Sequence, residues 1–300
     1  LGRGLWQAWR LAGRRRPNGV LVTGGYVSVP VALAAWLRRI PMTIYLPDIQ
    51  PGRAVRFLAR FAQRIAVTSM AAEQWLPARK LVVTGYPTRP ALRNADRAAA
   101  RHSWSLGADD QLLLVFGGSQ GSRRINLALA AAAPRLLEVC HIVHVSGTLD
   151  LRAAEAARAA LPETLRGRYH LHAYLDSPDM ALALAAADLA VCRAGAASLG
   201  ELPARGLPAV LVPLPISGGH QWPNARQLEA AGAVEVLADA DCDGPGLAAI
   251  VLRLLSEPVR LAAMAQASRS LDRPDAAAAI WAVVLQSLPL GSHRAQGEAR

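Results

Sequence analysis

The sequence contains few cysteines and no pattern that would pair them. Cys140, Cys192 and Cys242 stand at unrelated spacings, and no CxxC motif occurs. Disulfide frameworks and cysteine-based zinc sites both need cysteines at paired or repeated spacings. We therefore expect three buried thiols in a protein of a reducing compartment, of which the cytoplasm is the default.

Long apolar runs are also missing, although 52% of the residues are hydrophobic. No run reaches the roughly 18–20 residues that a membrane-spanning helix requires. The first residues lack the apolar core and the cleavage site of a signal peptide, and they lack a methionine. The chain begins in what reads as the middle of a helix, so we expect an N-terminally truncated fragment of a longer protein.

Acidic residues are nearly absent from the first 94 positions. This part contains 15 lysines and arginines but only Asp48 and Glu73 as acids, whereas the remaining residues carry 18 basic and 20 acidic side chains, within a total charge of +11. A genome that favours arginine would explain arginine over lysine, but it would not explain the asymmetry. The N-terminal part is therefore expected to meet an anionic partner: nucleic acid, phospholipid head groups or a pyrophosphate.

Two common nucleotide-binding patterns are missing, since neither GK[ST] nor GxGxxG occurs, and no DxD pair lies in a suitable loop. The sequence has instead two glycine turns at strand-to-helix junctions, GGYVSVP from residue 24 and GGSQGSRRIN from residue 117. Glycine permits a sharp turn, and the helix start that follows can hold negative charge. A single such loop is more often only a tight turn. Two of them in tandem favour two domains that face each other across a cleft.

Apolar runs alternate with helical patterns along the whole chain, which predicts an α/β protein with parallel sheets. We place a first domain at residues 1–94, a second at residues 95–288 whose last helix can pack back on the first, and a disordered tail at residues 289–300. Strands are expected at 20–23, 42–45, 64–68, 81–84, 112–116, 142–145, 169–173, 189–191, 209–212 and 234–237.

The stretch from Cys192 to Asn224 combines features of a ligand site. A strand, a small-residue turn, a short helix, a second strand and a polar loop would build a pocket at the carboxyl ends of parallel strands. The helix start offers N–H groups to an anion, and Glu201, one turn further on, could bond sugar hydroxyls. The alternative is an ordinary crossover with surface polar residues. The polar candidates around this crevice are Arg193, Ser198, Glu201, His220, Gln221 and Asn224.

These segments together resemble the MurG glycosyltransferases, which have the GT-B fold of two Rossmann-like parallel-sheet domains facing across a cleft. GGSQGSRRIN is similar to a glycine loop of that family, CRAGAASLGE to CRSGALTVSE, GYPTR to GNPVR, and HQWPNA to its (H/Q)QxxNA segment. The resemblance implies an inverting hexosyltransferase. It would move N-acetylglucosamine from UDP-N-acetylglucosamine to lipid-linked N-acetylmuramyl-pentapeptide, converting lipid I to lipid II in peptidoglycan and cell-wall synthesis.

The resemblance also implies roles for individual residues. Ser119 and Gln120 would lie beside the donor's diphosphate and sugar, and Arg89 would be a cation for the diphosphate unless it is only a solvated charge. Glu201 would accept the ribose hydroxyls unless it is an ordinary first-turn acid. The other donor-side positions are Tyr174 and Leu175 beside uracil, Ser198 near the α-phosphate, Arg193 in the crevice, His220 shaping the sugar pocket, and Gln221 and Asn224 at the hexose. The acceptor-side loop would be Gly24, Gly25, Tyr26 and Ser28.

The sequence departs from the family in its N-terminal part. The first glycine loop, GGTGGH, with the histidine usually proposed to help activate the acceptor, is absent, and LPDIQPG replaces HEQNxxPG. Asp48 falls near that element without matching it by position. The catalytic residue is therefore unassigned, and the fragment alone could be inactive. His141, His144, His170 and His172 are expected to be structural.

The implied setting is the cytoplasmic face of the cell membrane, with a UDP-sugar and an undecaprenyl-pyrophosphate-linked acceptor as partners and no metal, cofactor or nucleic acid. Leu5, Trp6 and Trp9, with the adjacent arginines, would either meet an anionic membrane surface or pack against the sheet. Three other functions stay open: a related GT-B lipid glycosyltransferase with another acceptor such as diacylglycerol, a UDP-sugar epimerase, and a non-catalytic UDP-sugar-binding subunit of a split enzyme.

Overall fold

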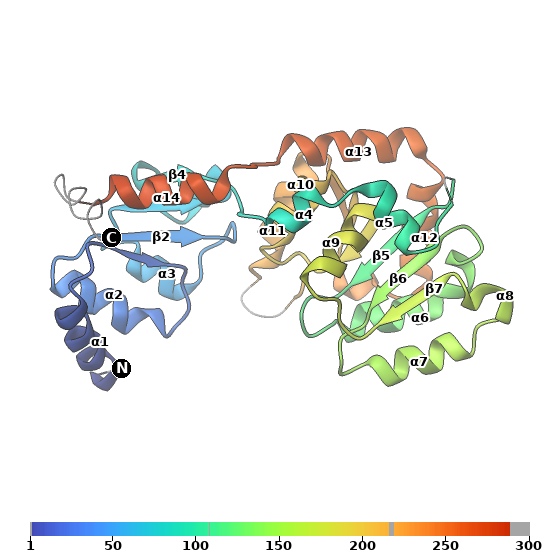
Figure 1. Cartoon of the computed structure of the whole chain (residues 1–300), viewed down its shortest axis with the longest axis horizontal. Coiled ribbons are helices and arrows are strands. Elements are labelled where there is room, and N and C mark those ends of the chain that lie inside the picture. Colours follow the sequence, from blue (N-terminus) through green and yellow to red (C-terminus); the bar gives the residue numbers. More distant parts are fainter. Residues whose placement is uncertain (1, 108, 216–218, 289–300) are drawn as a thin grey trace, which may run out of the picture. The chain divides into compact units, whose positions relative to one another are not determined.

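The computed structural model describes residues 2–107, 109–215 and 219–288 (Figure 1). The chain divides into two compact units, Leu1–Pro87 with Asp275–Arg300, and Thr88–Pro274. The division falls before the boundary expected at 94/95. The last helix, which was expected to be able to pack back on the first domain, belongs to unit 1. The tail expected to be disordered, 289–300, lies outside the described residues.

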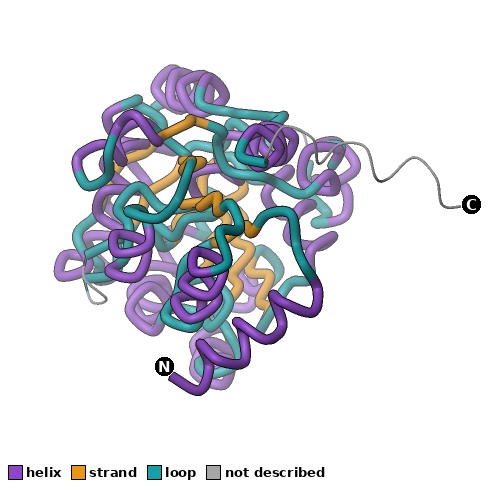
Figure 2. The backbone as a smooth tube through the Cα atoms, turned by 90° about the vertical axis from the view of Figure 1, so that its left-hand side faces the viewer, coloured by secondary structure: helices purple, strands orange, loops and turns teal. Residues whose placement is uncertain are grey.

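Unit 1 is built on a four-stranded parallel sheet in the order β1-β2-β3-β4. Its strands are β1 (Val20–Val22), β2 (Met42–Leu46), β3 (Arg64–Val67) and β4 (Leu81–Val83). Its helices are α1 (Gly2–Arg15), α2 (Ser28–Leu37), α3 (Arg53–Leu58), the short turns η1 (Met70–Gln74) and η2 (Ala78–Lys80), and α14 (Ala276–Gln286). In Figure 2, α1 is the helix that starts at the N-terminus.

Strand β2 is buried along its whole length, which is typical of a parallel strand covered on both faces. Alternate residues of β2 and β3 therefore point into two cores. Ile44 and Ile65 pack with residues of α2 and α3. Tyr45 and Ala66 pack instead against α14, which explains why a helix more than 200 positions along the chain belongs to this unit.

Unit 2 is built on a six-stranded parallel sheet in the order β10-β9-β8-β5-β6-β7. Its strands are β5 (Leu112–Phe116), β6 (His141–Val145), β7 (Tyr169–His172), β8 (Leu189–Cys192), β9 (Ala209–Leu211) and β10 (Val234–Val236). The other elements are α4 (Pro90–Asn94), α5 (Arg97–Ser103), α6 (Arg123–Leu136), α7 (Leu151–Ala159), α8 (Glu163–Arg166), α9 (Ser177–Ala186), α10 (Ser198–Arg205), α11 (Gln221–Ala230), η3 (Asp239–Asp241), α12 (Gly244–Leu255) and α13 (Pro258–Ser270).

The strand order of unit 2 creates a natural ligand position. From β5 the chain moves outward through β6 and β7, then returns to the other side of β5 and continues through β8, β9 and β10. Helices that leave β5 and β8 therefore diverge to opposite faces, and a crevice opens at the carboxyl ends of these two neighbouring strands. All ten strands expected from the sequence are present, with ends shifted by no more than one residue.

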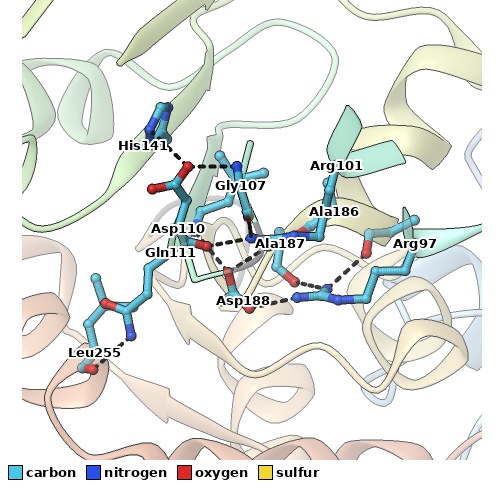
Figure 3. Close-up of polar contacts among 12 residues, drawn as sticks. Arg97, Arg101, Gly107, Asp110, Gln111, His141, Ala186, Ala187, Asp188 and Leu255 are labelled. Atoms are coloured by element: carbon cyan, nitrogen blue, oxygen red, sulfur yellow. Dashed lines mark hydrogen bonds and ion pairs between the residues drawn. The ribbon is translucent and has the colours of Figure 1, made fainter. Parts of the chain in front are cut away.

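The opposite, amino ends of β5 and β8 are held by a polar cluster (Figure 3). The Asp188 carboxylate accepts hydrogen bonds from Arg97 Nη2 at 2.6 Å and from the Leu112 amide at 2.8 Å. It also pairs with Arg101 at 3.4 Å, whose guanidinium bonds the carbonyl oxygens of Gly107 and Asp110. This cluster ties α5 and the linker after it to the sheet, so the amino ends of β5 and β8 form a fixed base for the crevice.

Four histidines on β6 and β7 are held inside unit 2, in agreement with the structural role expected for them. His141 and His170 stack with ring centroids 5.9 Å apart, and Trp104 packs edge-on against His170 and His172. His144 is 1% exposed. Burial lowers the pKa of all four, and that of His144 falls to about 4.

These lowered pKa values predict a loss of stability in acid. Between pH 6.5 and pH 4 the unfolded chain binds a proton at position 144 that the folded chain excludes, so this contribution is complete above pH 6.5 and is lost as the pH falls. The shift from 6.5 to about 4 corresponds to roughly 3 kcal/mol for His144. Urea unfolding of wild type and His144→Gln should therefore show a stability difference that shrinks from pH 7.5 to pH 4.5. A difference that stays constant over this range would contradict the prediction.

Within the three described ranges, no helix combines the length and the apolar character that a bilayer crossing demands.

Candidate functional site

A cavity of about 150 Å³ lies in unit 2 at the carboxyl ends of β5 and β8. The strand order reverses at this point, so the loop after β5 and the turn after β8 form facing walls. The start of α10 and the start of α11 complete the lining. Its residues are Phe116, Gly117, Gly118, Arg193, Gly195, Ala197, Ser198, Glu201, Leu202 and Gln221.

Two larger cavities of unit 2, of about 670 and 320 Å³, contain none of the residues expected to bind a ligand. The first lies beside the edge strand β10, where Glu235 pairs with Arg253 and Arg260. In the second, Arg97 and Arg205 donate to carbonyl oxygens at the carboxyl-terminal ends of α9 and α4. Arg97, Arg205 and Arg260 thus already bond carboxylates or carbonyl oxygens at helix ends, and we regard the smaller cavity as the site.

The loop after β5, residues 117–122, is shaped by close backbone packing. Gly121 has φ +78°, and a Cβ atom on it would stand 2.1 Å from the Ser146 carbonyl oxygen. Gly147 has φ +80°, and its Cβ would stand 2.5 Å from the Gln120 carbonyl oxygen. Only glycine fits at either position. This packing leaves Ser119 and Gln120 exposed at the tip of the loop.

The turn after β8 leads into α10 through short local hydrogen bonds. The Ser198 hydroxyl donates to the Gly195 carbonyl oxygen at 2.6 Å, and the Ser198 and Glu201 amides donate to Gly195 and Ala197 at 3.0 and 2.8 Å. The expectation that the amides at this helix start are free was therefore wrong for these two positions. The side chain of Ser198 is 7% exposed and stabilises the turn, although the residue still lines the cavity.

Glu201 faces the cavity from the first turn of α10. Burial raises the pKa of its carboxyl group, and the positive charge of Arg89 partly offsets this. Arg89 is exposed and directly precedes α4, so the structure brings the expected cation and the expected carboxylate into one electrostatic environment. A half-buried carboxylate of this kind is suited to accept hydrogen bonds from neutral hydroxyl groups.

Arg193 lines the cavity but is engaged by the protein. Its Nε donates to Ser122 Oγ at 3.0 Å, and its Nη1 donates to the Val212 carbonyl oxygen at 3.1 Å and to Asp239 Oδ1 at 2.5 Å. Its charge is thus neutralised, and the side chain joins the ends of β8 and β9 to the start of α6. Asp239 lies just after β10, and the sequence analysis did not include it among the site residues. Its position directly after a strand of the sheet was the signal that could have identified it as one.

Helix α11 places three expected residues near the turn after β8. Asn224 is fully buried, and its Nδ2 donates to the Ala194 carbonyl oxygen at 3.1 Å. Gln221 lines the cavity, and its Oε1 accepts from the Leu214 amide at 2.9 Å. His220 immediately precedes α11, and within the described residues its buried Nδ1 has no hydrogen-bond partner. Asn224 thus holds α11 in place, while Gln221 reaches the cavity itself.

Two expected residues, Tyr174 and Leu175, follow β7 and are not among the cavity lining. Tyr174 is 64% exposed, whereas Leu175 is 7% exposed. The loop expected on the acceptor side lies in unit 1, between β1 and α2. Tyr26 is 70% exposed there, and Ser28 Oγ donates to the Gly25 carbonyl oxygen at 2.7 Å. Gly24 and Gly25 have φ values of +100° and +83°.

The cavity combines a glycine loop, a carboxylate with a neighbouring arginine, and a glutamine. The loop can follow the outline of an anionic group, and the carboxylate can accept hydrogen bonds from a diol. In the part of the chain that the structure describes, no three histidine, cysteine, aspartate or glutamate side chains are grouped so that they could hold a metal ion.

Both halves of the chain match known domain families. Residues 112–280 match the glycosyltransferase family 28 C-terminal domain, and residues 1–67 match the glycosyltransferase family 28 N-terminal domain. The first of these matches comprises more than half of the chain and contains the whole cavity.

Individual proteins are similar over most of the chain. The UDP-N-acetylglucosamine–N-acetylmuramyl-(pentapeptide) pyrophosphoryl-undecaprenol N-acetylglucosamine transferase of Roseiflexus sp. (strain RS-1) is 45% identical over 92% of the chain and 71% of its own length. The crystal structure of Acinetobacter baumannii MurG superimposes with a TM-score of 0.75 and 27% sequence identity. The match covers 94% of this chain and 77% of the MurG chain. The UDP-GlcNAc 2-epimerase from Neisseria meningitidis, solved with UDP-GlcNAc, shares the fold with a TM-score of 0.72 and 13% sequence identity. The match covers 94% of this chain and 80% of the epimerase chain.

Proposed function

The chain belongs to the MurG family of N-acetylglucosamine transferases, and from this premise we propose that the cavity of unit 2 holds the UDP part of the donor. The family's reaction moves N-acetylglucosamine from UDP-N-acetylglucosamine to lipid-linked N-acetylmuramyl-pentapeptide, which is the step from lipid I to lipid II. One observation carries the proposal most strongly. The glycine loop, Glu201 and Gln221 line one cavity at the point where the strand order reverses.

In this proposal the nucleotide lies across the two walls of the cavity. The half-buried carboxylate of Glu201 accepts hydrogen bonds from both ribose hydroxyls, and Arg89, whose charge acts on Glu201, lies beside the diphosphate. Ser119 and Gln120, exposed at the tip of the glycine loop, contact the diphosphate and the sugar. Gln221 contacts the hexose hydroxyls, and Tyr174 with Leu175 flank uracil. Arg193 is assigned to positioning, because Asp239 already neutralises it.

The chemistry follows from where charge develops. A hydroxyl of the acceptor attacks the anomeric carbon in line, the glycosidic bond to UDP breaks, and negative charge grows on the leaving diphosphate. Backbone amides of the glycine loop and the guanidinium of Arg89 are fixed dipoles and charges that stabilise this anion without reorganising. We propose that these groups act without a metal ion. The proton of the attacking hydroxyl needs a general base, and we assign none to the described residues.

A transfer assay tests the acceptor. The chain is incubated with UDP-[¹⁴C]N-acetylglucosamine and either lipid-linked N-acetylmuramyl-pentapeptide or diacylglycerol, and label in the lipid fraction is counted. The proposal expects label in the muramyl lipid alone. Label in diacylglycerol would identify a lipid glycosyltransferase of another kind. Binding of the donor without transfer to either lipid would favour a non-catalytic subunit.

We further propose that unit 1 meets an anionic membrane surface at the cytoplasmic face, with α1 as the contact. No residue of α1 is buried, and Trp6 and Trp9 are 56% and 44% exposed. Arg10 lies 4.8 Å from the Trp6 ring, and Arg38 lies 3.9 Å from the Trp9 ring. Aromatic rings flanked by arginines suit the interface between head groups and acyl chains. The alternative that these tryptophans pack against the sheet does not agree with their exposure.

The double variant Trp6→Ala, Trp9→Ala is expected to bind vesicles of phosphatidylglycerol and phosphatidylcholine about 10-fold more weakly than wild type, because two interfacial rings are lost. Co-sedimentation measures the binding. Trp281→Ala is the matched control, since Trp281 is also exposed in unit 1 but belongs to α14. Binding that is unchanged in the double variant would rule α1 out as the contact.

A further inference from the structure

A buried histidine of unit 2 lies behind the glycine loop without lining the cavity. His144 stands on β6, is 1% exposed, and its two ring nitrogens contact the Tyr169 hydroxyl and the Asn126 amide, which in turn bonds Asp150. Buried polar groups in a parallel α/β core are uncommon and are normally fully bonded. The position of this group one layer behind the loop suggests a role beyond packing.

The hydrogen bonds fix the protonation of the ring. Asn126 Nδ2 donates to the Ser146 carbonyl oxygen at 2.8 Å and to Asp150 Oδ2 at 2.9 Å, so its Oδ1 can only accept. His144 Nε2, 2.9 Å from that oxygen, must therefore carry the hydrogen. Its Nδ1, 2.7 Å from the Tyr169 hydroxyl, then accepts from tyrosine. A neutral imidazole satisfies every group, in agreement with the lowered pKa of His144.

The chain of bonds ends at the floor of the glycine loop. The carbonyl oxygen of Ser146, which Asn126 holds, is the atom that Gly121 approaches so closely that no Cβ would fit. The next residue, Gly147, packs in the same way against the Gln120 carbonyl oxygen. Asn126 itself lies in the first turn of α6, directly after the loop, and its amide donates to the Ser122 carbonyl oxygen at 2.9 Å. The network thus holds the floor of the loop and the helix that follows it.

We propose that His144 is a positioning residue that, through Asn126 and the Ser146 carbonyl, sets the loop 117–122 in the shape that binds the donor's diphosphate. This inference rests on the proposed function. Without the imidazole, Asn126 Oδ1 loses its donor, the amide can turn away from Ser146, and the loop loses its fixed floor. The substitution should weaken binding of the diphosphate and not of the nucleoside. The reason is that Glu201, the proposed ribose ligand, stands on α10, on the other wall of the cavity.

The test compares UDP with uridine. Dissociation constants are measured by NMR titration of the whole chain for wild type, His144→Leu and His144→Gln. We expect His144→Leu to bind UDP about 10-fold more weakly than wild type, because roughly one hydrogen-bonded contact is lost. Its dissociation constant for uridine should stay within about 2-fold of the wild-type value. His144→Gln should recover most of the UDP affinity, because its Nε2 can still donate to Asn126. Tyr169→Phe, which disturbs folding less, should weaken UDP binding about 2-fold.

His170→Leu is the matched control, since it removes a half-buried histidine from the neighbouring strand β7 at a position with no hydrogen bond to Asn126 or Ser146. It is expected to keep both affinities. A His144→Leu chain whose ratio of UDP to uridine affinity equals that of wild type would overturn the inference, whatever its melting temperature. A wild-type chain that binds neither UDP nor uridine would instead overturn the proposed function itself.

Discussion

A Glu201→Ala chain is expected to bind UDP-N-acetylglucosamine about 100-fold more weakly than wild type. In the proposed site the half-buried carboxylate accepts two hydrogen bonds from the ribose, and each such charge-assisted bond contributes on the order of 1.5 kcal/mol. Isothermal titration calorimetry measures the difference. The matched control is Glu155→Ala, which removes an exposed glutamate from α7 of the same unit and should leave the affinity as it is.

A donor analogue makes the assignment of Glu201 more specific. UDP-N-acetylglucosamine built on 2′-deoxyuridine lacks one of the two hydroxyls. Wild type should bind this analogue about 10-fold more weakly than the natural donor, whereas Glu201→Ala should no longer distinguish the two. If the variant still discriminates as wild type does, another group holds the ribose and the role assigned to Glu201 is wrong.

Gly121→Ala is expected to lower kcat at least about 100-fold. The added methyl would stand 2.1 Å from the Ser146 carbonyl oxygen on a backbone with φ +78°, so the loop must leave the shape in which we propose that it binds the leaving diphosphate. The preorganised amides of such a loop are typically responsible for about 100-fold or more of the rate. Transfer to the muramyl lipid is the measurement, with donor titration beside it.

Two further glycines separate the causes of this loss. Gly118→Ala has a similar positive φ of +94°, but its new methyl meets no protein atom within 4 Å, so the loop can keep its shape and the loss should be smaller than for Gly121→Ala. Gly167→Ala, which meets nothing within 4 Å and lies before β7, should behave as wild type. A Gly121→Ala enzyme with full kcat would show that the shape of the loop is unimportant for catalysis.

The sequence was sufficient to predict the strands and most of the cavity. Buried parallel strands are short apolar runs bounded by glycine or polar residues, so their positions can be read directly from the chain. Glu201 and Gln221 follow two such strands at the same edge of the sheet, and they line the cavity as expected. The family resemblance rested on the same segments, and the similarity to known transferases confirms it.

What could not be predicted depends on partners that are distant in the chain. Arg193 was expected at the donor, but Asp239, 46 positions later, pairs with it. Asn224 was expected at the hexose, whereas its amide bonds the Ala194 carbonyl oxygen 30 positions earlier. Periodicity and motifs report local structure, and neither reveals which polar group a side chain finds after folding.

The histidines illustrate the same limit. His144 and His170 both stand in short β-strands of similar composition, and the sequence gives no ground for treating them differently. In the fold, His170 packs among aromatic rings, whereas His144 joins a hydrogen-bond chain that ends beneath the glycine loop. Only the spatial register of β6 on β7 and the first turn of α6 distinguishes a packing residue from a positioning one.

A crystal structure of the chain with UDP-N-acetylglucosamine tests the central claim most directly. The account predicts electron density for the uridine ribose within hydrogen-bond distance of both Glu201 carboxylate oxygens, with the diphosphate against the amides of residues 117–122. Density for the nucleotide in the larger cavity beside β10, or a diphosphate remote from the glycine loop, would contradict it.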